Sequence, residues 1–143
     1  MKIDQNTIKT LIPHRDPFLF VDEVEIIKTG ISGVGYKKFH ESEYFFKGHF
    51  PSKPIVPGVI LIEALAQTAG VVVSQTFGND KDRSVLFMSV SKAKFRKPVL
   101  PNDFITLKVD CINKVRSVYK FRGEAFESKN KVCEAEFSAM IGS

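Results

Sequence analysis

The longest apolar segment of the chain spans residues 59–76, and it predicts one long helix. Pro57 and Gly58 stand where this helix begins, because proline has no amide proton to donate there. Gly78 and Asn79 indicate where it ends. Apolar residues occur on nearly every side of the helix, so we expect it to be buried almost all round.

The polar residues of this helix form one narrow stripe. Glu63 and Gln67 are four residues apart and therefore share a face, and Gly70 and Ser74 continue it at helical spacing. A buried carboxylate is costly unless it is paired, protonated or functional. Burial raises its pKa and lets it act as a proton donor. The alternative is a Glu63 that reaches solvent or pairs with a lysine, and a Gln67 that only fills a subunit contact.

The rest of the chain alternates apolar and polar residues or is rich in β-branched and aromatic residues, which predicts strands. Six are expected, over residues 18–28, 31–39, 84–93, 104–114, 118–127 and 132–141. A short helix capped by Asp4 or Asn6 precedes them, and residues 41–47 suit a single turn. A single apolar helix needs a sheet around it. The pattern therefore predicts one α+β domain, residues 1–143, in which an antiparallel six-stranded sheet wraps around one long central helix.

Composition and charge narrow the function classes. The chain has 143 residues and a net charge of +5, which suits acidic partners in general. Aromatic and basic residues are not interleaved, so we expect no nucleic-acid binding. The apolar segment 57–77 is interrupted by Glu63 and Gln67, and the N-terminus lacks a signal-peptide pattern. We therefore expect no membrane association and a cytoplasmic protein.

The two cysteines indicate neither a metal site nor a disulfide. Cys111 and Cys133 lie in strand-like segments without metal-ligand spacing, so two free, packed thiols are expected. The chain also lacks a glycine-rich dinucleotide turn and a phosphate loop. It has no Gly-x-Ser-x-Gly motif, which leaves a serine hydrolase unsupported. We expect no cofactor and no metal.

The candidate chemistry lies in the segment that reads FKGHFPSKPIVPGVILIEALAQ, residues 46–67. Its prolines and glycines exclude regular structure before the helix and stiffen the loop that carries His49. Histidine can take and return a proton near neutral pH, although a loop histidine packed among Phe and Pro is the plainer interpretation. The amides of Gly58 and Val59 lie at a helix N-terminus, which favours an oxygen that gains negative charge. An ordinary helix start explains them equally well.

Taken together, these residues supply a base, an acid and an oxyanion site. His49, Glu63 and the amides of Gly58 and Val59 suit the removal of a proton beside a carbonyl group with loss of a β-leaving group. Gln67 can orient the Glu63 carboxylate by a hydrogen bond. An acyl thioesterase and a non-catalytic acyl-thioester-binding module remain open as alternatives.

Several motifs resemble, in order along nearly the whole chain, the FabZ type of (3R)-hydroxyacyl-acyl carrier protein dehydratases. They are HRDPFL (14–19) with Val21-Asp22, GHFP (48–51), Pro54, Pro57-Gly58-Val59, EALAQ (63–67) and KFRKPV (94–99). The resemblance implies a hot-dog fold, with the sheet around the long helix. It also implies the conversion of (3R)-hydroxyacyl-acyl carrier protein to the trans-2-enoyl thioester and water in type II fatty acid biosynthesis. A sister family that also isomerises the double bond usually has Asp in place of Glu63, so the resemblance implies dehydration alone.

The same resemblance implies where the site lies. It implies a homodimer, often assembled into a trimer of dimers, with His49 from one subunit and Glu63 from the other. The Pro-Gly-Val amides would bind the thioester carbonyl, and whether His49 alone performs both proton transfers stays open. The chain departs from the family at Ser52, Ser89, Ser91 and Asn102, of which Asn102 replaces a turn glycine and can adopt a positive φ. Candidate docking charges for the acidic carrier protein are Lys53, Lys92, Lys94, Arg96 and Lys97.

Overall fold

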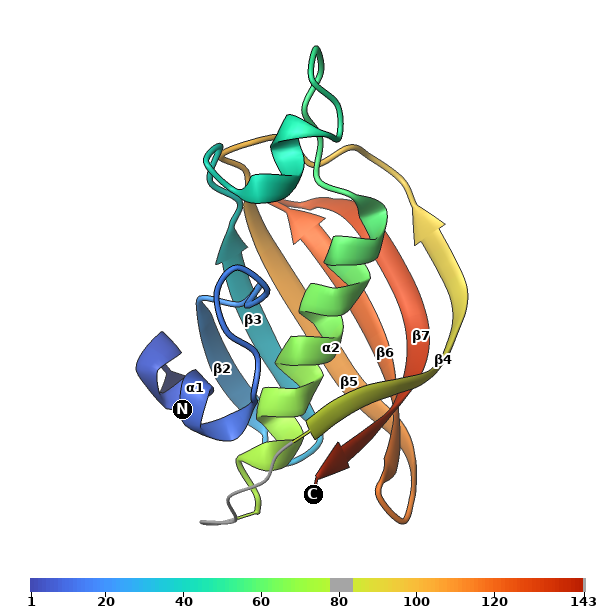
Figure 1. Ribbon diagram of the computed structural model, residues 1–143. Coiled ribbons are helices and arrows are strands. Elements are labelled where there is room, and N and C mark those ends of the chain that lie inside the picture. Colours follow the sequence, from blue (N-terminus) through green and yellow to red (C-terminus); the bar gives the residue numbers. More distant parts are fainter. Residues whose placement is uncertain (78–83, 143) are drawn as a thin grey trace.

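A long helix lies along the inner face of one curved antiparallel sheet in the computed structural model of the chain (Figure 1). The structure describes residues 1–77 and 84–142. In the described part, the sheet has seven strands in the order β1-β2-β3-β5-β6-β7-β4, and every neighbouring pair is antiparallel. The predicted α+β class, with a sheet wrapped around a central helix, is confirmed. The fold is the hot-dog fold that the motifs led us to expect.

The elements follow one another with few long connections. Their bounds are β1 (Lys2–Ile3), α1 (Gln5–Leu11), β2 (Glu23–Lys28), β3 (Ser32–Lys38), the 3₁₀ turn η1 (Tyr44–Lys47), α2 (Gly58–Ser74), β4 (Ser84–Phe95), β5 (Phe104–Val115), β6 (Val118–Glu127) and β7 (Asn130–Gly142). The six predicted strands are present, and the sheet gains a seventh, the two-residue β1, in a segment too short to show alternation. The single turn expected over residues 41–47 is η1.

Burial of α2 follows the prediction closely. From Ile60 to Ser74 every residue is buried except Glu63. The helix begins at Gly58, one residue before the predicted start, with Pro57 as its N-cap residue. It ends at Ser74, earlier than predicted, where the bonding changes to tighter i→i−3 turns: the Thr76 amide donates to the Val73 carbonyl and the Phe77 amide to the Ser74 carbonyl, both at 3.0 Å. Gly78 and Asn79, the expected stop, lie outside the described residues.

The N-terminal segment shows which residue caps the first helix and corrects the predicted start of the strand over residues 18–28. Asp4 caps α1, since its carboxylate accepts a hydrogen bond from the Thr7 amide at 2.9 Å. The strand predicted over residues 18–28 begins only at Glu23. Residues 18–20 do not extend it because the Gln67 side chain, and not a neighbouring strand, binds their backbone groups.

Two local details also match the sequence. Asn102 has a φ of +72°, the conformation expected where it replaces a turn glycine. Cys111 and Cys133 are free thiols. Burial, helped by the Glu134 carboxylate, raises the pKa of Cys133 to about 11, and burial also raises the pKa of Cys111. These thiols therefore stay protonated near neutral pH and serve as packing groups.

Glycines of β3 allow α2 to lie close against the sheet. A methyl group on Gly35 would overlap the Thr68 side chain, and one on Gly33 would meet Val72 at 2.6 Å. Both glycines lie on the buried face of the strand. The absence of side chains there sets the distance between α2 and β3, and so the depth at which the helix lies.

We predict that Gly35→Ala lowers the free energy of unfolding by about 1–3 kcal/mol, because Thr68 and the helix have to shift. Urea denaturation of the two proteins measures the difference. Gly48→Ala is the matched control, since nothing lies within 4 Å of the added methyl group. Equal losses in the two variants would contradict the proposed close packing.

Candidate functional site

His49 is held by backbone contacts on both sides. Its amide donates to the Phe45 carbonyl of η1 at 3.0 Å, and its carbonyl accepts from the Ile55 amide at 2.8 Å. Its ring Nδ1 lies 3.1 Å from the Ile55 carbonyl. Because a carbonyl only accepts, this contact requires the proton on Nδ1. A neutral His49 then has Nε2 free as a base.

A pocket of about 410 Å³ opens beside His49 at the start of α2. Both Gly58 and Val59 contribute to its wall, and their first-turn amides have no acceptor within the helix. Phe95 of β4 lies so close to Gly58 that an added methyl group would meet its ring at 2.6 Å. The pocket is lined by His49, Ile55, Val56, Gly58, Val59, Leu61, Phe95, Arg96, Lys97, Pro98, Val99 and Val132. This combination offers an apolar wall, one imidazole and a helix N-terminus.

Glu63 belongs to a separate polar cluster. Its Oε2 accepts a hydrogen bond from Gln67 Nε2 at 2.9 Å and lies 3.4 Å from His14 Nε2. The carboxylate side chain is 17% exposed, so it is largely but not completely withdrawn from water. The expected bond between Gln67 and Glu63 is present. A pairing with histidine replaces the lysine pairing considered as an alternative.

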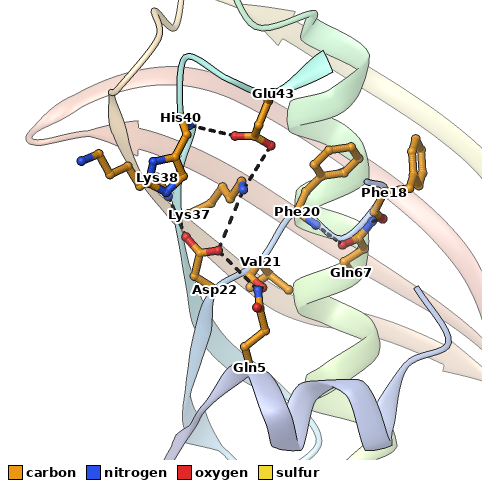
Figure 2. A network of polar contacts seen from close by, with 10 residues as sticks. All are labelled: Gln5, Phe18, Phe20, Val21, Asp22, Lys37, Lys38, His40, Glu43 and Gln67. Atoms are coloured by element: carbon orange, nitrogen blue, oxygen red, sulfur yellow. Dashed lines mark hydrogen bonds and ion pairs between the residues drawn. The ribbon is translucent and has the colours of Figure 1, made fainter. Parts of the chain in front are cut away.

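Gln67 is completely buried and uses both ends of its amide (Figure 2). Its Oε1 accepts from the Phe20 amide at 2.7 Å, and its Nε2 donates to the Phe18 carbonyl at 3.0 Å as well as to Glu63. The side chain therefore connects the helix to the segment that precedes β2. Its position fixes the orientation of the Glu63 carboxylate.

His14 was not among the predicted site residues. It lies in the irregular segment that follows α1, and its Nδ1 is buried without a hydrogen-bond partner in the described structure. The sequence signal was the motif HRDPF, but the contact spans 49 residues of chain and no local pattern reveals it.

Within one chain, the structure brings His14, Glu63 and Gln67 together, and it brings His49, Gly58 and Val59 together. Glu63 does not line the His49 pocket.

Residues 1–77 and 84–142 contain no group of three or more His, Cys, Asp or Glu side chains placed to hold a metal ion. None of the helices in those ranges has the length and apolar character to cross a membrane.

The fold is that of the hot-dog domains, and the family and relatives that follow show that the chain is an enzyme of this fold. Residues 12–136 match the model of the FabA-like domain, so the chain belongs to the FabA-like family. A relative from Rhodopseudomonas palustris (strain HaA2), named 3-hydroxyacyl-[acyl-carrier-protein] dehydratase FabZ, is 43% identical over 97% of this chain and 93% of its own length. A protein of the same name from Granulibacter bethesdensis is 46% identical over 97% of this chain and 82% of its own.

Solved structures with low sequence identity share the fold. The dehydratase heterocomplex ApeI:P from Xenorhabdus doucetiae has a TM-score of 0.75 at 12% identity, covering 95% of this chain and 91% of that one. An uncharacterized protein, PH1136, from Pyrococcus horikoshii has a TM-score of 0.67 at 17% identity, covering 98% and 93%. At these identities the likeness concerns the fold alone.

We predict that Gln67→Met lowers the free energy of unfolding by about 2–3 kcal/mol, because the buried Phe20 amide and the Phe18 carbonyl lose their partner. Chemical denaturation measures the change. Gln75→Met, at the C-cap position of the same helix, is the control, since Gln75 Oε1 has no partner in the described structure, and its effect should stay within about 0.5 kcal/mol. A Gln67→Met protein as stable as the parent would refute the anchoring role.

Proposed function

We propose that this chain dehydrates (3R)-3-hydroxyacyl thioesters on acyl carrier protein, giving the trans-2-enoyl thioester and water, by acid-base catalysis with His49 and Glu63. The observation that carries the proposal is the pocket in which the His49 ring stands beside the first amides of α2. Family membership and relatives above 40% identity over nearly the whole chain support the reaction class. Fatty acid biosynthesis is the pathway that such a reaction serves.

His49 is the proposed base. Its Nδ1 contact with the Ile55 carbonyl leaves Nε2 to take the α-proton of the thioester. The electrons move toward the thioester oxygen, which the Gly58 and Val59 amides would stabilise by roughly 3–4 kcal/mol per donor. The C–O bond at the β-carbon then breaks, and the double bond forms between the α- and β-carbons.

Glu63 is the proposed acid for the departing hydroxyl group. Protonation of this hydroxyl group lets it leave as water. After product release, the proton on His49 passes to Glu63, which restores both groups. Gln67 orients this carboxylate through the bond at 2.9 Å. His14, at 3.4 Å, is a neighbour through which the carboxylate can regain a proton. The alternative, in which His49 transfers both protons, leaves Glu63 as the group that orients the hydroxyl.

A homodimer is the proposed active form, because Glu63 lies outside the His49 pocket of its own chain. Strand β4 forms one edge of the sheet, opposite β1, and among the described residues it pairs with β7 alone. Its exposed apolar side chains are Leu86, Phe87, Met88, Val90 and Phe95. An exposed apolar edge favours pairing with another chain. Since Phe95 also lines the pocket, a partner at this edge would lie beside His49 and could supply its Glu63. A trimer of dimers is the higher assembly that we propose from the resemblance.

We predict that Met88→Lys shifts the protein toward a monomer, because a charge on the exposed edge opposes pairing. Size-exclusion chromatography with light scattering measures the mass. Ile27→Lys is the control, since Ile27 is 62% exposed on β2, far from β4 in the strand order. A dimer or hexamer that survives Met88→Lys unchanged would contradict an interface at β4.

The acidic carrier protein would meet the basic residues near the pocket. Three of the five candidates are paired within the chain: Arg96 with Glu134 at 2.6 Å, Lys97 with Glu127 at 3.3 Å and Lys92 with Glu136 at 3.6 Å. Among the described residues, Lys53 and Lys94 form no ion pair, so they are the stronger candidates for docking.

We also infer a cytoplasmic location, because free thiols persist in a reducing compartment.

The reaction is tested with a purified 3-hydroxyacyl carrier-protein substrate, following enoyl absorbance. We predict that His49→Ala and Glu63→Gln each lower kcat at least about a hundredfold, since each removes one proton-transfer group. His40→Ala is the matched control, because the His40 side chain is exposed and its amide, which bonds to Glu43, is retained. Thiol release in place of enoyl formation would favour a thioesterase. Binding without turnover would favour the non-catalytic module, and either result would overturn the proposal.

A further inference from the structure

Lys37 is a buried cation on the inner face of the sheet. It follows Gly33 and Gly35 on the buried side of β3 and is only 6% exposed. Its ammonium group lies 3.2 Å from Glu43 Oε1 and 3.9 Å from Asp22 Oδ1, and 5.5 Å from the centre of the Phe39 ring. A buried ammonium group is retained only where such partners compensate for lost water. Figure 2 shows Lys37 between the two carboxylates.

The Glu43 partner leads to His49. Glu43 is the residue that precedes η1, and its second oxygen accepts from the His40 amide at 2.9 Å. This carboxylate therefore ties the start of η1 to the end of β3. Within η1, the Phe45 carbonyl accepts the amide of His49 at 3.0 Å. A shift of η1 is thus passed directly to the backbone of the proposed base.

The Asp22 partner leads to Glu63. Asp22 Oδ2 accepts from the Lys38 amide at 2.9 Å, and the Asp22 amide donates to the Tyr36 carbonyl at 2.7 Å. Asp22 therefore fixes the end of the segment 18–22 against β3. Gln67 binds the beginning of the same segment and donates to Glu63. The segment 18–22 and η1 also contact each other, since the centres of the Phe20 and Phe45 rings are 6.2 Å apart.

We propose that Lys37 is a positioning residue that holds both the His49 loop and the Gln67–Glu63 pair in place for the reaction. This inference rests on the proposed function. Lys37 does not line the His49 pocket and acts only through Glu43 and Asp22. No local sequence pattern pairs these three residues, although the alternation of β3 does place Lys37 on the apolar face.

The test compares Lys37→Met with Lys38→Met. Methionine keeps the length and apolar stem of lysine but removes the ammonium group. Lys38 is exposed and contributes only its backbone amide, which methionine retains. We expect Lys37→Met to lower kcat about tenfold to a hundredfold with KM changed less than about twofold, because small misplacements of catalytic groups reduce rate strongly. Lys38→Met should keep both constants.

Amide hydrogen exchange gives a readout that does not depend on turnover. We expect Lys37→Met to speed exchange at the His49 and Phe20 amides about tenfold or more, while Ala69 in the middle of α2 keeps its rate. General destabilisation would speed all three. Glu43→Gln, which keeps the shape of the side chain and removes its charge, serves if Lys37→Met does not fold. Like Lys37→Met, it should speed amide exchange at His49 and lower kcat.

The outcomes separate the two proposals. If the wild-type protein turns over substrate and the folded Lys37→Met protein keeps its kcat, the inference about Lys37 is wrong while the proposed function stands. If the wild-type protein does not turn over substrate, the proposed function fails. The exchange rates at the His49 and Phe20 amides then decide whether Lys37 holds the His49 loop and the segment 18–22. Unchanged rates at these two amides in Lys37→Met would overturn the inference about Lys37.

Discussion

The buried amide of Gln67 is the contact on which the arrangement of the site depends. It is the one side chain of α2 that bonds both to a carboxylate of the helix and to the backbone of a segment 47 residues earlier in the chain. Because an unpaired amide would be costly at this depth, the helix, the segment 18–20 and Glu63 are fixed together. Without Gln67, the Glu63 carboxylate would lose the hydrogen bond at 2.9 Å and keep the contact with His14 at 3.4 Å.

Around this contact, the chain divides the chemistry between two places. The loop before α2 carries His49 and is stiffened by prolines and by η1. The second turn of α2 carries Glu63, with Gln67 below it and His14 beside it. The ammonium group of Lys37 pairs with Glu43, which precedes η1, and with Asp22, in the segment that Gln67 binds. The two groups proposed for catalysis nevertheless do not share a pocket within one chain, and the exposed edge at β4 is where the proposed second chain would complete each site.

Periodicity was sufficient for most of the fold. The apolar run of α2, the alternation of the four C-terminal strands and the spacing of Glu63 and Gln67 are local patterns, and the structure reproduces them. The errors occur where distant residues decide. Residues 18–20 match the strand pattern, but the Gln67 side chain takes the hydrogen bonds of the Phe18 carbonyl and the Phe20 amide. His14 lies in the irregular segment after α1, and only folding brings it to Glu63. Lys37 of β3 pairs with Asp22, just before β2, and with Glu43, just before η1, which alternation alone does not reveal.

The central claim is that each site takes His49 from one chain and Glu63 from its partner. The most direct measurement mixes His49→Ala and Glu63→Gln chains by co-expression and assays dehydration. Random pairing places half of the chains in mixed dimers, each with one intact site of two, so about a quarter of the wild-type activity should return. A mixture no more active than either variant alone would contradict the shared site.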